Sequence, residues 1–166
     1  MLFERKSYLQ RLISADGNGM IKIITGIRRC GKSFLLFELF KKYLTEKGVA
    51  LNHIIQINLE DRRNKRLRNP DNLLEYIDSQ LIDQDKYYIL IDEIQLVPEF
   101  EDVLNSYLHI SNAEVYVTGS NAKFLSKDVI TEFRGRGWEI RVRPLSFSEY
   151  YETLGGEQSK RLEEYY

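Results

Sequence analysis

The segment from Gly26 to Ser33 constrains this 166-residue chain most, because it reads GIRRCGKS and matches the pattern G-x-x-x-x-G-K-[ST]. An apolar run from Met20 to Thr25 precedes it, and a Phe- and Leu-rich stretch from Ser33 to Lys47 follows it. The pattern therefore lies between an expected strand and an expected helix, the context in which such a loop wraps a phosphate group. A plain glycine-rich turn is the alternative, and the flanking elements disfavour it.

We expect this loop to bind the phosphates of a nucleotide, since its glycines let the backbone approach them and the following helix directs N–H groups at them. Lys32 would bridge toward the terminal phosphates, and Ser33 would hold Mg²⁺. The candidate nucleotide-binding residues are Gly26, Ile27, Arg28, Arg29, Cys30, Gly31, Lys32, Ser33 and Phe34.

Two adjacent carboxylates, Asp92 and Glu93, follow a second apolar run, Tyr87 to Ile91. Five apolar residues without alternation are typical of a strand covered on both sides, and ligands bind at the carboxyl ends of such strands. We expect Asp92 to orient the Mg²⁺ shell and Glu93 to polarise an attacking water as general base. An ordinary acidic loop is the alternative, and the pairing with the phosphate loop favours the functional interpretation.

Small polar side chains end the next expected strand, from Glu114 to Thr118. One of Thr118, Ser120 and Asn121 could bond the γ-phosphate or the water, or these residues could cap the next helix. The spacing does not choose among them.

Arg134 and Arg136 lie between an expected helix, Ala122 to Phe133, and the last expected strand, Trp138 to Val142. Either could stabilise charge on a transferred phosphoryl group, within its own subunit or across an interface. Solvated surface arginines are the alternative.

Length and composition predict one folded domain with a core, because 166 residues fit one domain and 43% of them are hydrophobic. A net charge of -1 provides no global field for nucleic acid, so any basic site must be local. The basic run Arg62 to Arg68 could be a patch for a phosphate backbone. Glu60 and Asp61 beside it and the lack of interleaved aromatics favour a solvated loop. The single cysteine and the lack of a long apolar run indicate a cytoplasmic chain without a membrane segment.

We expect Cys30 to be tolerated rather than catalytic, yet open to alkylation. His53, in an expected strand, and His109, in an expected helix, lack ligand spacing and receive no role.

Short apolar runs alternate with stretches of helical period along the whole chain. An opening helix carries Tyr8 to Ile13, a helix starts at Asn69-Pro70, another opens at Pro98, and a last one follows Ser146. Parallel strands joined by helical crossovers predict a three-layer α/β sandwich.

Five segments in this order, GIRRCGKS, INLED, YILIDEIQ, VTGSN and FRGRGWEIRVRPLSFSEYY, resemble the prokaryotic AAA-type ATPases that carry a second domain of unknown function. The resemblance covers about Glu4 to Tyr151 and implies a P-loop NTPase fold with five parallel strands in the order 5-1-4-3-2. It also implies ATP and Mg²⁺ as ligands, with Lys32 and Ser33 contacting them and Asp92 and Glu93 as the acids. Ser120 or Asn121 would sense the phosphate, and Arg136 would be an arginine finger.

Members of that family usually continue beyond the ATPase domain. We therefore expect residues 1–154 to form the ATPase domain and residues 155–166 to begin a missing segment, through which an unknown protein or DNA partner would act. The predicted function is Mg²⁺-dependent ATP hydrolysis, slow in isolation, in a possible homo-oligomer. A nucleotide-dependent switch with negligible turnover is the first alternative, and a small-molecule kinase is the second.

Overall fold

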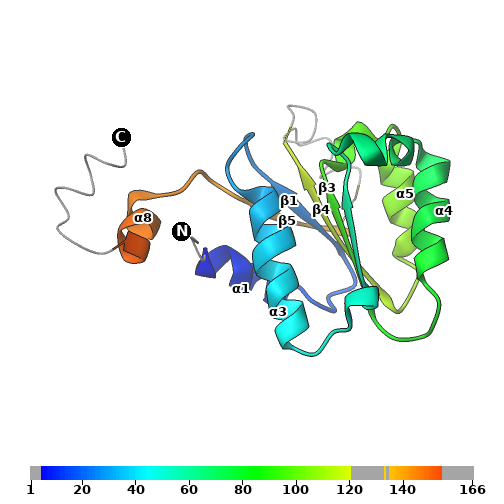
Figure 1. The fold of residues 1–166 in the computed structure, drawn as a ribbon, viewed down its shortest axis with the longest axis horizontal. Helices are drawn as coiled ribbons and strands as arrows, with labels where there is room; N and C mark the ends of the chain where they lie inside the picture. Colours follow the sequence, from blue (N-terminus) through cyan, green and yellow to red (C-terminus); the bar gives the residue numbers. More distant parts are fainter. Residues whose placement is uncertain (1–4, 121–132, 134, 155–166) are drawn as a thin grey trace.

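The computed structural model describes residues 5–120, 133 and 135–154. One parallel sheet of five strands organises these residues (Figure 1). In chain order the elements are α1 (Lys6–Ser14), β1 (Ile21–Thr25), α2 (Lys32–Phe34), η1 (Leu35–Phe40), α3 (Lys41–Glu46), η2 (Leu51–His53), β2 (Ile54–Asn58), η3 (Arg62–Arg68), α4 (Pro70–Gln80), β3 (Tyr87–Asp92), η4 (Ile94–Leu96), α5 (Phe100–Tyr107), β4 (Ala113–Gly119), β5 (Gly137–Arg141) and α8 (Phe147–Leu154).

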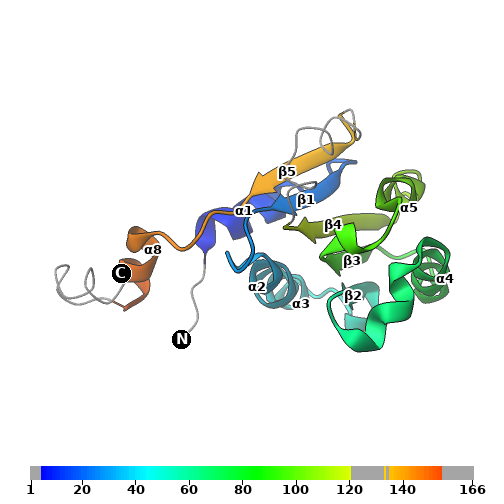
Figure 2. The ribbon, with the colours of Figure 1, turned by 90° about the horizontal axis from the view of Figure 1, so that it is seen from above.

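The strand order is β2-β3-β4-β1-β5, which is the expected order 5-1-4-3-2 read from the other edge (Figure 2). In this order, β4 lies between β1, which leads to the phosphate loop, and β3, which ends at Asp92. All four strand pairs are parallel. The predicted α/β P-loop fold is confirmed. Because the strands are parallel, all their carboxyl ends meet at one edge of the sheet, which we call the carboxyl edge.

Helices cover both faces of the sheet, and successive strand residues alternate between two apolar cores (Figure 2). Ile89 and Ile91 belong to the core under α4 and α5, whereas Leu90 belongs to the core under α1, α2, η1 and α3. All six residues of β3 are buried, as expected for a strand covered on both sides. No helix among the described residues has the length and apolar character to cross a lipid bilayer.

Local sequence signals set several boundaries. Asn69 caps α4 by accepting a hydrogen bond from the Asn72 N–H at 3.1 Å, and Pro70 occupies the first turn, as predicted. The helix expected from Ser33 to Lys47 is one continuous helical segment, but its middle part, η1, has the wider turns of a π-helix. The helix expected to open at Pro98 begins two residues later, because Glu99 adopts a left-handed conformation with a φ of 55°.

Candidate nucleotide site

The loop after β1 requires glycine at its first position. Gly26 has a φ of 152°, and a Cβ there would overlap the carbonyl oxygen of Val142 and lie 2.7 Å from the Cys30 sulfur. Gly31, before α2, has a φ of 90°, which favours glycine for conformational rather than packing reasons. The loop therefore lies against the backbone that leaves β5, and a side chain at position 26 would separate them.

Lys32 is buried, with 3% of its surface exposed. Its ammonium group donates to the carbonyl oxygens of Gly26 at 3.1 Å and Ile27 at 2.9 Å. Among the residues that the structure describes, no carboxylate pairs with it. A buried cation held by neutral acceptors alone remains electrostatically uncompensated, so this position favours an anion.

Ser33 and Asp92 meet at the carboxyl edge, as the sequence predicts. The Ser33 hydroxyl lies 2.8 Å from each carboxylate oxygen of Asp92, and the Thr118 hydroxyl donates to Oδ1 at 2.5 Å. Burial raises the pKa of Asp92 above its ordinary value, against the opposing effect of these two hydroxyl donors. A hydroxyl beside a carboxylate is an all-oxygen donor set, which fits Mg²⁺.

Glu93 turns sharply away from β3, with a left-handed φ of 59° that is uncommon outside glycine. Its backbone N–H donates to the Thr118 hydroxyl at 2.9 Å, which holds this turn in place. Its carboxylate oxygen Oε2 accepts hydrogen bonds from the Ser120 hydroxyl at 2.6 Å and from the side-chain amide of Gln95. Thr118 thus fixes both acids, whereas Ser120 contacts only Glu93.

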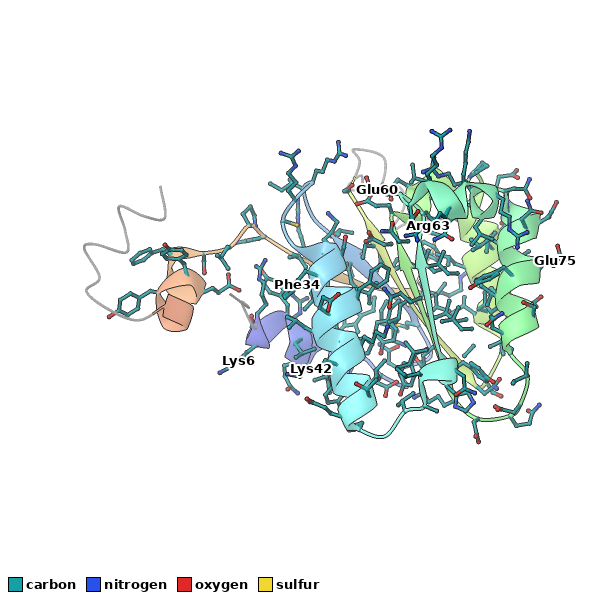
Figure 3. The ribbon with its side chains drawn as sticks, viewed as in Figure 1. Lys6, Phe34, Lys42, Glu60, Arg63 and Glu75 are labelled. Atoms are coloured by element: carbon teal, nitrogen blue, oxygen red, sulfur yellow. The ribbon has the colours of Figure 1, made fainter. Side chains whose placement is uncertain are left out.

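A cavity of about 380 Å³ opens beside these groups. It is lined by the loop, by α2, by Glu93 and by Glu60, which follows β2. Figure 3 shows Glu60 at the same edge of the sheet as the loop, where its carboxylate lies 3.6 Å from the Arg28 guanidinium. Both of these side chains are largely exposed, so their ion pair contributes little stability.

Arg136 lies at the opposite, amino edge of the sheet. It precedes β5, and its carbonyl oxygen accepts a hydrogen bond from the N–H of Ile21, at the start of β1. The phosphate loop begins after Thr25, at the other end of that strand, so β1 separates Arg136 from the loop. Asn121 and Arg134 lie outside the described residues.

Two expectations about histidines were wrong, and the structure disfavours one about Cys30, which stays a prediction. Cys30 is only 4% exposed and its thiol faces the Val142 carbonyl oxygen at 3.5 Å, which disfavours alkylation. His53 lies in η2 instead of a strand, and its Nε2 is 2.9 Å from Asp83, with Asp85 nearby in a group that could hold a metal ion. His109 follows α5 rather than lying within a helix.

The basic run Arg62 to Arg68 forms the exposed turn η3 beside this edge of the sheet (Figure 3). Arg63 pairs with Asp61 at 2.6 Å, and Arg68 donates to the carbonyl oxygen of Leu59 at 2.9 Å. These two side chains are therefore bound to their own loop, which agrees with the surface interpretation.

Two residues that no sequence pattern indicated have contacts at the site. Gln95 reaches Glu93 because the left-handed turn folds the chain back within two residues. Arg5 donates to the carbonyl oxygen of Cys30 at 2.8 Å, from a position 25 residues earlier in the chain. No spacing pattern could have indicated the second contact, because it depends on how α1 packs.

The fold and the carboxyl-edge site together place the chain in the class of P-loop nucleotide-binding domains. A family model described as an AAA domain matches residues 18–151, and the chain belongs to that family.

Two curated relatives are similar to most of the chain. It is 35% identical over 162 residues to an uncharacterized protein of Haemophilus influenzae, and 32% identical over 141 residues to the uncharacterized protein MJ1544 of Methanocaldococcus jannaschii. These matches cover 97% and 85% of the chain but 40% and 30% of the relatives, so both relatives are much longer than this chain.

A DNA polymerase III, gamma subunit-related protein of Thermotoga maritima has a similar crystal structure. It is 14% identical with a TM-score of 0.61, and the match covers 94% of this chain and 54% of that protein. At this identity the likeness concerns the fold alone.

Proposed function

We propose that this domain binds ATP with Mg²⁺ and hydrolyses it. The observation that carries the proposal is the buried ammonium of Lys32, which is held by two carbonyl oxygens and belongs to a residue that lines a cavity of about 380 Å³. A polyphosphate is the anion that fits a cation backed by a helix N-terminus and a glycine-containing loop.

Each site residue has a role in this proposal. Lys32 and the loop N–H groups bind the phosphates, while Ser33 and Asp92 hold the metal ion, which neutralises phosphate charge when bound. Glu93 takes a proton from the attacking water. The Ser120 hydroxyl and the Gln95 amide hold its oxygen Oε2, which orients the carboxylate for this step.

Arg136 would complete the site of a second copy of the chain. Its backbone lies at the amino edge, at the far end of β1 from its own phosphate loop, which disfavours a role within one subunit. An arginine provided across an interface stabilises charge on the transferred phosphoryl group. The isolated domain would therefore hydrolyse ATP slowly.

Two variants test the proposal by separating binding from turnover. Lys32→Ala should abolish ATP binding in calorimetry, because it removes the buried cation. Glu93→Gln should bind Mg-ATP normally but lower phosphate release by about 10²- to 10⁴-fold, because an amide cannot act as a base. A folded Lys32→Ala protein with unchanged affinity would overturn the site, and a Glu93→Gln protein with full activity would overturn the role of Glu93. Normal binding by the parent protein without any turnover would favour a nucleotide-dependent switch.

A further inference from the structure

Arg5 is a buried arginine that the proposed function does not use. It precedes α1, only 6% of its surface is exposed, and its φ of 43° places it in the left-handed region. A bulky residue adopts this conformation when its surroundings hold it there. A buried guanidinium also requires hydrogen-bond acceptors in several directions.

Three segments provide those acceptors. Nη1 donates to the carbonyl oxygen of Cys30 at 2.8 Å, Nη2 donates to the carbonyl oxygen of Arg143 at 2.8 Å, and Nε donates to the Glu149 carboxylate at 3.0 Å. The Tyr8 ring lies against the guanidinium, 4.6 Å from its carbon atom to the ring centre. Arg5 therefore joins the phosphate loop to the chain that leaves β5.

The contact with Cys30 bears on phosphate binding through the geometry of one peptide bond. The carbonyl of Cys30 and the N–H of Gly31 belong to the same planar peptide unit and point in opposite directions. When Arg5 holds the carbonyl oxygen, it also fixes the direction of the Gly31 N–H. That N–H is one of the loop donors available to a phosphate group.

Glu149 performs a second task at the start of α8. Its carboxylate accepts hydrogen bonds from the Ser146 N–H at 2.9 Å and the Ser146 hydroxyl at 3.0 Å, while its own N–H donates to that hydroxyl at 3.3 Å. This reciprocal pair is a capping box, which fixes where the helix begins. Burial acts to raise the pKa of Glu149, but the Ser146 N–H and the Arg5 guanidinium outweigh it and lower the pKa.

The helix α8 stands apart from the layers of the sheet in Figure 1 and follows an extended segment in Figure 2. It ends the described part of the chain, and both curated relatives are more than twice as long as this chain's match to them.

We propose that Arg5 is a positioning residue that couples phosphate binding at the loop to the placement of α8, through Cys30 at one end and Glu149 at the other. This inference rests on the proposed nucleotide function. When the loop binds a phosphate, the Cys30–Gly31 peptide adjusts, and the Cys30 carbonyl oxygen that accepts from Arg5 moves with it. The same guanidinium pairs with the Glu149 carboxylate, which caps α8, so the movement also reaches that helix. Such coupling is reciprocal, so disturbing the Arg5–Glu149 pair also changes nucleotide affinity.

The test compares two substitutions at the start of α8 that remove different contacts of Glu149. Glu149→Gln removes the ion pair with Arg5 but keeps a side chain that serves in a capping box. Ser146→Ala removes the capping hydroxyl but leaves the ion pair. Amide hydrogen exchange over residues 149–154 is measured with and without Mg²⁺ and a nonhydrolysable ATP analogue, and calorimetry gives the affinity for the same analogue.

In the parent protein, the analogue should change the exchange rates in α8. Glu149→Gln should remove this change and alter affinity by about fivefold, whereas Ser146→Ala should speed exchange in α8 with and without the analogue and keep the change. Arg5→Lys should behave like Glu149→Gln, because an ammonium group cannot span three acceptors as a guanidinium does. In an Arg5→Lys background, Glu149→Gln should have no further effect on affinity.

The possible failures are distinct. If calorimetry shows that the parent protein binds the analogue while exchange in α8 stays unchanged, the coupling is wrong and the nucleotide function stands. If Ser146→Ala and Glu149→Gln give the same result, Glu149 acts only as a helix cap and the coupling is again wrong. If the parent protein binds no nucleotide, the proposed function fails and the coupling fails with it.

Discussion

Two buried lysines, Lys22 in β1 and Lys32 in α2, differ in what surrounds their charge. Lys22, near the amino edge, is fully buried, forms an ion pair with Glu114 and lies 5.1 Å from the centre of the Tyr116 ring. Lys32, at the carboxyl edge, is equally buried but contacts carbonyl oxygens. A buried cation paired with a carboxylate is complete within the fold, whereas one held by neutral acceptors can still bind an anion.

The residues around the two lysines differ in the same way: those near Lys22 form ion pairs, whereas those near Lys32 include strained backbone. Near Lys22, Lys86 lies 2.7 Å from Asp16, which also accepts a hydrogen bond from the Tyr88 hydroxyl at 2.9 Å. Near Lys32, left-handed backbone occurs at Arg29 and Glu93. Strained backbone concentrates where a protein acts on a ligand. The contacts at the amino edge thus serve stability, whereas those at the carboxyl edge favour binding of an anion.

Arg136 gives the largest expected effect and is the exception to the division, because it would act catalytically from the amino edge. In assembled protein, Arg136→Ala should lower turnover by about 10³- to 10⁵-fold and leave ATP affinity unchanged. Mixing Arg136→Ala with Glu93→Gln subunits should restore part of the activity, since each can complete a site only across an interface. If sedimentation demonstrates association but mixing restores no activity, Arg136 does not act across an interface.

Lys22→Met tests the stabilising side of the comparison. It leaves the largely buried Glu114 carboxylate with the half-exposed Lys86, 3.7 Å away, as its remaining partner. Urea denaturation should therefore show a loss at or below the value of about 3 to 5 kcal/mol for a fully uncompensated buried charge. Calorimetry under conditions where the variant is folded should give unchanged ATP affinity. The comparison fails if Lys22→Met weakens binding as Lys32→Ala does.

Thr118→Val should have the smallest effect, because it removes two hydrogen bonds but no charge. Thr118 lies at the carboxyl edge and holds both acids through these bonds. The valine removes the acceptor for the Glu93 N–H and the donor to Asp92, which should cost about 1 to 3 kcal/mol of stability and raise the Mg²⁺ concentration needed for nucleotide binding. Thr118→Ser keeps the hydroxyl and serves as the control. Equal stability in both variants would show that these bonds contribute nothing measurable.

The sequence predicted the fold and the centre of the site because both depend on local patterns. The GIRRCGKS spacing located the loop, and an apolar strand ending in Asp92 located the carboxylate that Ser33 meets. The strand order came from family resemblance, since periodicity does not indicate which strands are neighbours.

The remaining site contacts depend on pairs that no spacing encodes. Arg5 and Glu149 are 144 residues apart, and His53 and Asp83 are 30 apart. The sequence left Thr118 and Ser120 as equivalent candidates, because their roles depend on the left-handed turn at Glu93. Tertiary packing decides such pairings.

The position of Arg136 would also determine how many nucleotide sites in an assembly are complete. If Arg136 acts across an interface, each subunit offers its arginine from one edge of the sheet and receives another at the opposite edge, so the copies would join head to tail. In an open row of such copies, one terminal subunit keeps a nucleotide site that no neighbour completes, and the other terminal arginine has no site to serve. In a closed ring, every nucleotide site receives an arginine and every arginine has a site. Activity per subunit would therefore rise with the length of an open row and reach its full value at ring closure, which makes specific activity a measure of assembly geometry.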